Sequence, residues 1–292
     1  MLLLLAAMWG ASYLFIKVAV EDIPPAAMTD LRLLIAAVLL TAYLLHRSGP
    51  AALGQLRTAW VPCLVLGIIN AALPMTLVAW GETHIDSSIA GIAQASVPIF
   101  VAILGLRLLP HDPLRASQMI GLAIGLSGVA LITGVHPAGG GWAVAGTFAV
   151  VLSSLSYASG GIYGQLRVHD TPGPVLAAGS MIAGAIALLP FAVADPPTQA
   201  PGTTALAGLL ALALIPTFFG QLLLFRMLRL FGSRRLSLVT FLMPGFAIVY
   251  GALLLDEPIS AAALAGLGLI LAGVVLASGQ RLLGMRAQEE PA

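Results

Sequence analysis

The chain has 292 residues, of which 59% are hydrophobic and only 9% are charged, with a mean hydropathy of +1.01. A soluble domain carries about 25% charged residues, so this composition excludes a water-soluble globular protein and predicts one that lies in a lipid bilayer. The net charge of +1 gives no basis for a nucleic-acid partner, and the single cysteine, Cys63, excludes a disulfide within the chain.

Ten apolar stretches, each long enough to cross a bilayer as a helix, follow one another with short connections rich in proline and glycine. The first lacks the basic leader of a signal peptide and is read as a retained helix. In chain order the predicted helices cover residues 2–20, 26–45, 60–80, 87–109, 115–135, 142–164, 174–194, 204–225, 235–255 and 259–279. The predicted fold class is therefore an all-α membrane protein with ten transmembrane helices.

Basic residues are distributed unequally between the two sets of helix ends. With a cytoplasmic N-terminus, eleven Lys and Arg residues fall near cytoplasmic ends, and only Lys17 and Arg32 fall near the opposite ends. Because cytoplasmic loops carry the excess of Lys and Arg, both termini are predicted to be cytoplasmic. The sequence thus predicts an integral protein of a cell membrane, the inner membrane of a prokaryote, with residues 281–292 as a short cytoplasmic tail.

The fourth and fifth predicted helices resemble the ninth and tenth, which indicates an internal repeat. The matching pairs share a spacing of 146 residues or, after a one-residue slip, 145; they are Pro98 with Pro244, Gly105 with Gly251, Pro113 with Pro258, Gly121 with Gly266, and Gly128 with Gly273. Two repeats of five helices, residues 1–137 and 138–280, must have opposite orientations because five is odd. Inverted-topology repeats are typical of secondary transporters.

Several motifs carry a family resemblance that covers nearly the whole chain. They are Trp9-Gly10-Ala11-Ser12 with Lys17, Leu31-Arg32, the blocks around Pro98 and Pro244, and Leu-Leu-Leu-Asp-Glu-Pro at 253–258. On these residues the chain resembles EamA-type transporters of the drug/metabolite transporter superfamily, although His111-Asp112 departs from the family pattern. The resemblance implies a ten-helix carrier with two EamA-like repeats and cytoplasmic ends. It leaves the substrate open among amino acids, sugars, nucleotide derivatives and drugs.

Helix breakers near the middle of the predicted spans mark the expected substrate site, because such carriers bind near the midplane at broken helices. A proline inside a helix removes one backbone hydrogen bond and frees a carbonyl. The predicted breaks are Pro74, Pro98, Pro216, Gly220 and Pro244. At a spacing of 146 residues, Pro74 corresponds to Gly220 and Pro98 to Pro244 across the two repeats. The alternative interpretation is that these prolines only kink the helices for packing.

Polar and aromatic side chains near these breaks are the candidate substrate contacts. Residues four apart share a helix face, so Trp9 lies on one face with Tyr13, and Thr217 lies on another with Gln221. The predicted substrate-binding residues are Trp9, Tyr13, Asn70, Gln94, Tyr157, Thr217, Gln221 and Thr240. Aromatic rings would stack on the solute and amides would orient it. Hydrogen bonding between helices is the alternative role for the same side chains.

Ionisable side chains in the predicted spans are few. Lys17 and Arg32 lie near outer helix ends, where a long side chain either extends to the headgroups as an anchor or neutralises an anionic group on the substrate. No acid falls near the middle of a predicted span, and Glu82, His84 and Asp86 are assigned to a loop. Exchange or facilitated efflux without a buried carboxylate relay is therefore favoured.

These observations predict a secondary transporter that moves small metabolites by alternating access. Efflux or exchange of amino acids or other neutral or zwitterionic amphipathic solutes fits a wall so poor in charge. The alternatives are a channel, which the two-fold repeat disfavours, and an intramembrane enzyme. An enzyme is not expected, because all five histidines fall in predicted loops and no helix carries a paired-acid or Glu-x-x-His motif. No cofactor or metal is expected; the expected partners are a small-molecule substrate and the bilayer, and the oligomeric state, a monomer included, stays open.

Overall fold

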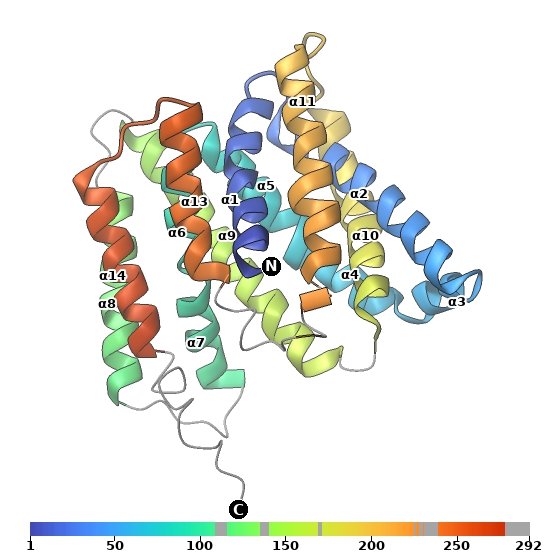
Figure 1. Cartoon of the computed structure of the whole chain (residues 1–292), viewed down its shortest axis with the longest axis horizontal. Helices are drawn as coiled ribbons and strands as arrows, with labels where there is room; N and C mark the ends of the chain where they lie inside the picture. Colours follow the sequence, from blue (N-terminus) through green and yellow to red (C-terminus); the bar gives the residue numbers. More distant parts are fainter. Residues whose placement is uncertain are drawn as a thin grey trace, which may run out of the picture.

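The computed structural model describes residues 1–108, 116–134, 140–168, 171–224, 226–227, 230 and 239–277, and helix is the only regular structure in them (Figure 1). The α-helices are α1 (Leu2–Ala19), α2 (Pro25–Ser48), α3 (Ala51–Thr58), α4 (Trp60–Gly67), α5 (Leu73–Glu82), α6 (Ser87–Gln94), α7 (Val97–Leu108), α8 (Ala116–Gly134), α9 (Gly140–Arg167), α10 (Gly173–Ala194), α11 (Thr203–Leu212), α13 (Val239–Leu254) and α14 (Ala261–Ala277). The His111-Asp112 motif, the predicted boundary at 137–138 and the tail 281–292 lie outside the described residues.

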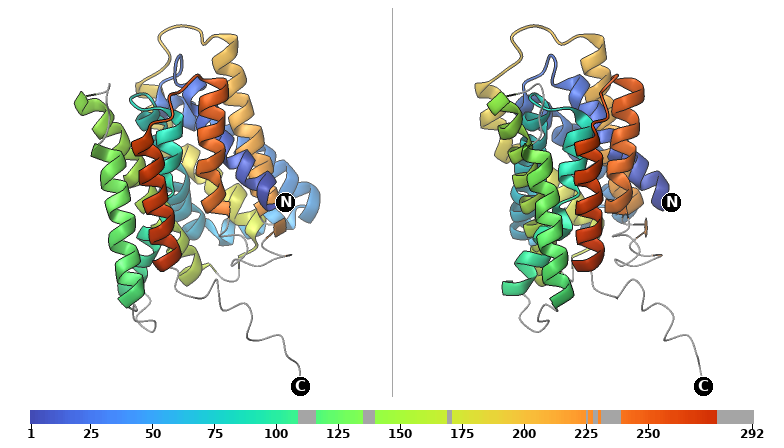
Figure 2. Two further views of the ribbon diagram at one scale, coloured as in Figure 1. Left: turned by 60° about the vertical axis from the view of Figure 1, so that its left-hand side comes forward. Right: turned by 90° about the vertical axis from the view of Figure 1, so that its left-hand side faces the viewer.

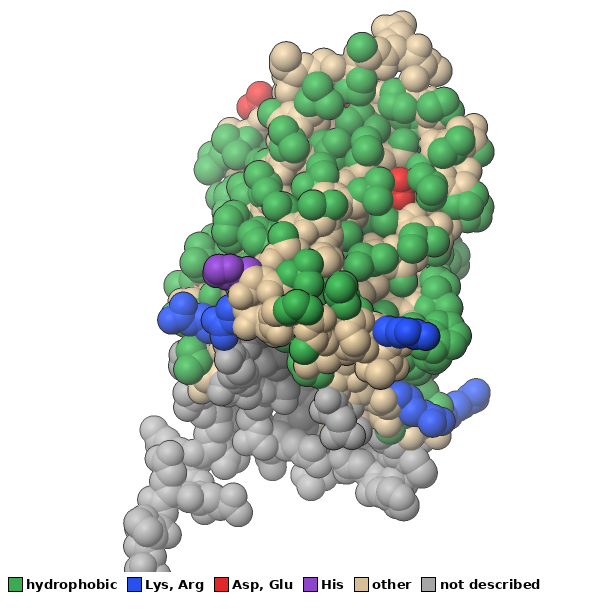
Figure 3. Space-filling model, turned by 90° about the vertical axis from the view of Figure 1, so that its right-hand side faces the viewer, with side chains coloured by type: hydrophobic (Ala, Val, Ile, Leu, Met, Phe, Trp, Pro, Cys, Tyr) green, Lys and Arg blue, Asp and Glu red, His purple; other side chains and the backbone are tan. Residues whose placement is uncertain are grey.

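Seven helical segments of the described chain are long and apolar enough to cross a membrane. They are Leu2–Ala19, Pro25–Ser48, Trp60–Glu82, Ser87–Gly105, Gly140–Arg167, Gly173–Ala194 and Thr203–Leu224. Three shorter apolar helices cover Met119–Leu131, Leu242–Leu254 and Ala261–Leu276. Large hydrophobic side chains cover the outer surface, and Figure 3 shows them over most of one face, with the basic side chains of that face near one end. Such a surface is stable only in lipid, so the chain is an integral membrane protein.

Three of the spans that the sequence predicts as single helices are interrupted in the structure. A π-helical segment, η1 (Ile68–Ala72), joins α4 to α5, and a second, η2 (Ala213–Phe219), follows α11. A turn at residues 95–96 separates α6 from α7. Each interruption contains a proline or precedes one by two residues, namely Pro74, Pro98 or Pro216, because proline cannot donate the backbone hydrogen bond that continues a helix.

The helices pack in matched sets. α2 packs on α10, and α8 packs on α14 along one edge of the molecule (Figures 1 and 2). α1 contacts α11 and α13, while α9 contacts α5 and the pair α6–α7. α10 also contacts α4 and η1, while α2 contacts α11 and η2. Several contacts of α1 and α2 thus have counterparts in contacts of α9 and α10.

Glycines permit the closest of these approaches. A Cβ on Gly67 of α4 would come within 2.7 Å of the backbone of Gly184 and Ser180 in α10. On the other side of the molecule Gly273 of α14 lies directly against the backbone of Gly121 and Gly125 in α8. Small residues let membrane helices approach until their backbones touch, and this contact replaces the hydrophobic driving force that lipid cannot supply.

Candidate functional site

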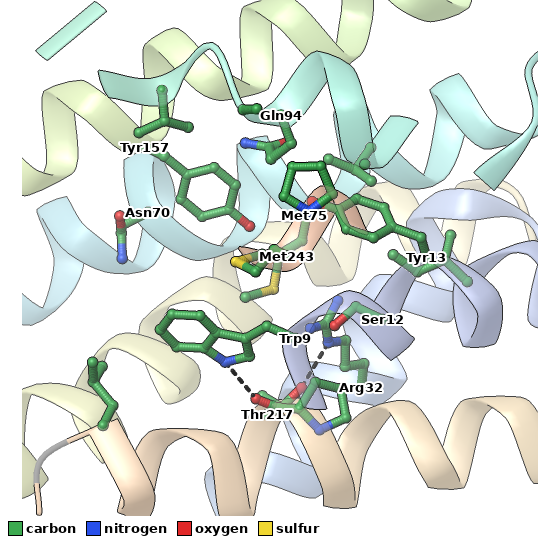
Figure 4. Close-up of a pocket in the computed structure, with 18 of the residues that line it drawn as sticks. Trp9, Ser12, Tyr13, Arg32, Asn70, Met75, Gln94, Tyr157, Thr217 and Met243 are labelled. Atoms are coloured by element: carbon green, nitrogen blue, oxygen red, sulfur yellow. Dashed lines mark hydrogen bonds between the residues drawn. The ribbon is translucent and has the colours of Figure 1, made fainter. Parts of the chain in front are cut away.

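A cavity of about 310 Å³ lies among α1, α2, α5, α6, α9, η1, η2 and α13 (Figure 4). Seven of the eight predicted substrate-binding residues line it, although they come from distant parts of the chain: Trp9, Tyr13, Asn70, Gln94, Tyr157, Thr217 and Gln221. The eighth, Thr240, is in α13, and its side chain lies outside the described residues. The structure thus brings the predicted set together around one hollow.

The predicted helix breaks differ in their relation to this cavity. Pro216 and Pro244 line it, whereas Pro74 and Pro98 are not among the described lining residues. Pro74 is the second residue of α5 and directly follows η1. Gly220 leaves room for the indole of Trp9, because a Cβ there would come within 2.8 Å of the Trp9 Nε1 atom. The breaks therefore shape the wall, some directly and some through their neighbours.

The backbone of η2 is held by side chains from the first two helices. Trp9 Nε1 donates a hydrogen bond to the carbonyl of Pro216 over 3.1 Å. The Thr217 hydroxyl donates to the Leu212 carbonyl and accepts from Arg32 Nε, both at 2.8 Å. A π segment that contains proline leaves carbonyls without their usual partners, and these side chains supply partners for two of them.

Arg32 is not an interface anchor. Its side chain is only 6% exposed and lines the cavity, although the sequence places it near a helix end. Among the described lining residues it is the only one with a formal charge. A buried cation without an acid beside it in the cavity wall is costly, and such groups inside membranes mark functional sites by default.

Lys17 is half-buried, and its ammonium is bonded to the protein backbone. Its ammonium donates to the carbonyls of Glu82 at 2.8 Å and Ile85 at 2.7 Å, and it does not line the cavity. The Glu82 carbonyl ends α5, where the helix leaves acceptors free and its dipole favours a positive charge, and the Ile85 carbonyl lies in the turn that follows. Lys17 therefore caps a helix end.

The prediction that Glu82 belongs to a loop is wrong. This residue is the last residue of α5, not part of a loop, and its side chain is completely buried. Among the described residues, neither of its carboxylate oxygens has a hydrogen-bond partner. The sequence pattern missed it because Gly81 and Glu82 read as the polar end of an apolar run, whereas α5 continues through both.

The wall around η1 is built by close contact with α9. Ser156 donates to the Ile69 carbonyl over 2.6 Å, and a Cβ on Gly160 would come within 2.7 Å of the Asn70 amide oxygen. Ser153 donates to the Gln94 amide oxygen over 2.9 Å. The Gln94 amide nitrogen is buried without a partner among the described residues, so this group remains available to a solute.

Sequence reasoning missed part of the lining. Ser12 follows Trp9 by three residues on the same helix face, and this spacing would have found it. Met75 and Met243 also line the cavity, and in Figure 4 their thioethers lie between the rings of Trp9 and Tyr157. Methionine adapts its shape to varied apolar partners. No sequence signal separates such a methionine from one that faces lipid.

The cavity therefore combines aromatic and thioether surfaces, several neutral hydrogen-bonding groups and one guanidinium. Pockets for small molecules are mostly apolar and have a few convergent polar groups, as this one has. Within the described part of the chain, no group of three or more His, Cys, Asp or Glu residues could hold a metal ion. The arrangement is suited to binding a small amphipathic solute.

Comparisons with known proteins agree with this geometry. The chain is 28% identical over 284 residues to an uncharacterized transporter of Archaeoglobus fulgidus, covering 96% of this chain and 98% of the relative. It is 29% identical to the inner membrane transporter YedA of Escherichia coli K12, covering 92% and 86%. A probable amino-acid metabolite efflux pump of Salmonella typhimurium is 24% identical, covering 94% and 92%.

One crystal structure matches the fold with a TM-score of 0.68 over 98% of this chain and 97% of the other, at 20% identity. At that identity the match concerns the fold alone. The model of the EamA-like transporter family matches residues 1–134 and 144–279, which is nearly the whole chain. The described helices, the central cavity and the named relatives agree with that assignment. The chain belongs to the EamA-like transporter family.

Proposed function

We propose that the protein is a secondary carrier that moves small amphipathic solutes, amino acids among them, across the membrane by alternating access. The observation that carries this proposal is the cavity of about 310 Å³ between the interrupted helices, with Arg32 as the only formal charge among its described lining residues. Membrane transport follows from the family. The solute class, the mechanism and the direction, efflux or exchange, are the proposed part.

The proposed architecture is two inverted repeats of five spans each, residues 1–137 and 138–280. The three shorter apolar helices bring the number of spans from seven to ten. The matched contacts of α1 and α9, and of α2 and α10, are those that a two-fold relation between the halves requires. The family model matches two segments with nearly the same boundaries. Two similar halves have two near-equivalent packings, one open to each side.

The proposed orientation places both termini in the cytoplasm of a prokaryotic cell, with the protein in the inner membrane. The excess of Lys and Arg near one set of helix ends supports it, and Figure 3 shows the basic side chains of one face gathered near one end. YedA, a relative, is named an inner membrane transporter. Glu82 and the loop that follows it then lie toward the outside.

The lining residues favour a solute that has three different groups. The Arg32 guanidinium binds a carboxylate, because its fork of donors matches two carboxylate oxygens. The rings of Trp9 and Tyr157 hold an apolar body. The amide of Asn70 accepts a hydrogen bond from an ammonium or hydroxyl group. An amphipathic amino acid satisfies all three, and the relative named a probable amino-acid metabolite efflux pump agrees with this class.

The test is counterflow in proteoliposomes that hold the purified protein. Vesicles are loaded with unlabelled L-phenylalanine, L-methionine or L-leucine, and uptake of the same labelled amino acid is followed. Saturable uptake that internal substrate accelerates is expected for at least one of them. Uptake that neither saturates nor responds to internal substrate would indicate a channel, and no uptake of any of the three would overturn the proposed solute class.

The same assay tests the site. Gln94→Ala, Tyr157→Ala and Gln221→Ala each remove a lining side chain without touching Arg32, and each is expected to lower counterflow severalfold. Gly161→Ala on α9 is the matched control, because a Cβ at this position meets no atom within 4 Å. If all three lining variants showed normal counterflow at normal expression, the solute would not pass through this cavity.

A further inference from the structure

Glu82 continues the stripe of α5 that faces the cavity. Met75 and Val78 line the cavity, and Glu82 follows Val78 by four residues on the same helix face. Glu82 itself lies beyond the end of the cavity. A motion that extends the cavity toward this end of α5 would therefore bring the carboxyl into its wall.

This end of the cavity is closed in the structure. One continuous apolar cluster fills it, contributed by both halves of the chain and including Ile16, Ala19, Ile85 and Leu209. Ile16 belongs to this cluster and also lines the cavity, so the cluster begins where the cavity ends. The Glu82 side chain has no exposure to solvent.

The buried carboxylate of Glu82 has no hydrogen-bond donor among the described residues. The Lys17 ammonium donates to the backbone carbonyls of Glu82 and Ile85 and not to this carboxylate. Transfer of an ionised carboxylate from water to such a place is very costly, whereas a neutral carboxylic acid loses much less. The closed arrangement thus favours the acid that carries its proton.

The charged groups around Glu82 do not remove this preference. Lys17 and Arg32 attract a negative charge at this position, and Glu257 repels it. Arg32 donates its Nε–H to a threonine hydroxyl, and Glu257 accepts two backbone N–H bonds at the start of α6. Tyr13 of α1 adds only a neutral hydroxyl nearby. On the α9 side, Gly81, the residue before Glu82, lies against Gly146 and Val150, and neither of these residues titrates.

We propose that Glu82 is a proton-binding site of the carrier, and that this end of the cavity closes only when the Glu82 carboxyl carries a proton. The proposal rests on the proposed alternating access. When this end opens, water reaches the carboxyl, which ionises and releases its proton to the solution on that side. When it closes, one proton from the same solution returns to the carboxylate. The pH on that side therefore sets the balance between the closed and open forms.

A cysteine reporter of opening at this end tests the proposal without any substrate. Ser87→Cys in a Cys63→Ala background places one thiol in the closed region, where Ser87 is completely buried and its hydroxyl has no partner among the described residues. The exchange of such a hydroxyl for a thiol is mild. The rate of reaction with a water-soluble maleimide is measured from pH 5 to pH 8, with and without E82Q in the same reporter background.

The ratio of the two rates at each pH cancels the ionisation of the thiol itself. The reaction rate of the Glu82 protein divided by that of E82Q is expected to be near one at low pH, because both side chains are then neutral. Above the pH at which Glu82 titrates, this ratio of rates should rise by up to about tenfold per pH unit, the limit for one proton. A ratio that stays constant across the range would overturn the proposal.

A second reporter keeps the test decisive if E82Q does not fold. Thr83→Cys in the same background places a thiol at an exposed position next to Glu82. The rate at Ser87→Cys divided by the rate at Thr83→Cys should rise with pH while Glu82 is intact, and a flat quotient would overturn the proposal. Because no solute is present, failure of the counterflow experiment and failure of this one are separate results.

Discussion

η1 and η2 occupy corresponding places in the two halves, since a shift of 146 residues moves η1 inside η2. Each has a carbonyl that accepts a hydrogen bond from the first helix of the other half: Pro216 from Trp9 of α1, and Ile69 from Ser156 of α9. A π segment gives up regular hydrogen bonds, and in both cases a neighbouring helix supplies a donor. Both π segments are thus held in a similar way.

The side chains that these segments present to the cavity are different. η1 presents Asn70, a neutral amide pressed against Gly160. η2 presents Thr217, which is hydrogen-bonded to the Arg32 guanidinium. The comparison suggests two tasks to test: we expect the backbone interruptions to shape the cavity wall and the side chains to determine what binds. We expect the η2 side to hold the charged end of a solute and the η1 side to orient the rest.

The largest effect should come from Arg32→Gln, which removes the charge on the η2 side. Loss of a charge-assisted contact worth about 3 kcal/mol should lower kcat/KM for a carboxylate-bearing amino acid by roughly 100-fold. Arg32→Lys should retain part of the activity, because the charge stays while the paired geometry is lost. Counterflow of an amino acid and of its uncharged amide derivative provides the measurement.

The control is Arg47→Gln, the same change on the same helix at an exposed position. It should leave kcat/KM within a factor of two. Equal losses for the carboxylate and the amide in Arg32→Gln would mean that the guanidinium only supports the wall. In that case the asymmetry between η1 and η2 would have no meaning for the solute.

Local features of the two π segments could be predicted from the sequence. Proline positions and apolar length are local properties, so Pro216 and Pro244 and the lining residues near them could be located without coordinates. The spacing of 146 residues related the two broken regions for the same reason. Aromatic and amide side chains such as Tyr157 and Gln94 were found because polar groups are rare in apolar helices.

The depth of a charged side chain could not be predicted in this way. Arg32 and Lys17 read as groups near helix ends, yet Arg32 is directed to η2 and Lys17 to the end of α5. Glu82 reads as a loop residue, and only packing against other helices buries it. Burial near a helix end depends on neighbours from distant parts of the chain, and the sequence of one helix does not contain that information.

Gly160→Ala should produce the next largest effect, this time on the η1 side. The added methyl would come within 2.7 Å of the Asn70 oxygen and must displace this amide from the cavity wall. Overpacking of this kind costs about 1–3 kcal/mol, so both Tm and counterflow should fall, the latter roughly tenfold. Gly161→Ala, one residue away with open space around it, should lower neither, because alanine is the better helix former. If Gly160→Ala and Gly161→Ala changed Tm and counterflow equally, the close contact between α9 and η1 would be contradicted.

Trp9→Phe tests the donor to η2 while it keeps an aromatic ring in the cavity. The variant loses the Nε1–H bond to the Pro216 carbonyl, which is worth about 1 kcal/mol. Counterflow should fall about fivefold, because the same ring both holds η2 and lines the cavity. A fall as large as that of Trp9→Ala would mean that the lost Nε1–H bond accounts for the whole effect and the aromatic ring for none of it. No fall would mean that this hydrogen bond does not contribute to transport.

Ser156→Ala removes the corresponding donor to η1 and should have the smallest effect on transport. Ser156 bonds to the Ile69 carbonyl but does not line the cavity, so its loss should lower stability without changing solute contacts. A cost of about 1 kcal/mol corresponds to a fall of roughly 2–4 °C in Tm. Counterflow at a temperature well below Tm should stay within a factor of two of the original protein. If Ser156→Ala instead reduced counterflow as strongly as Trp9→Phe, both donors would act through the backbone of their π segments, and the proposed division between cavity shape and solute chemistry would fail.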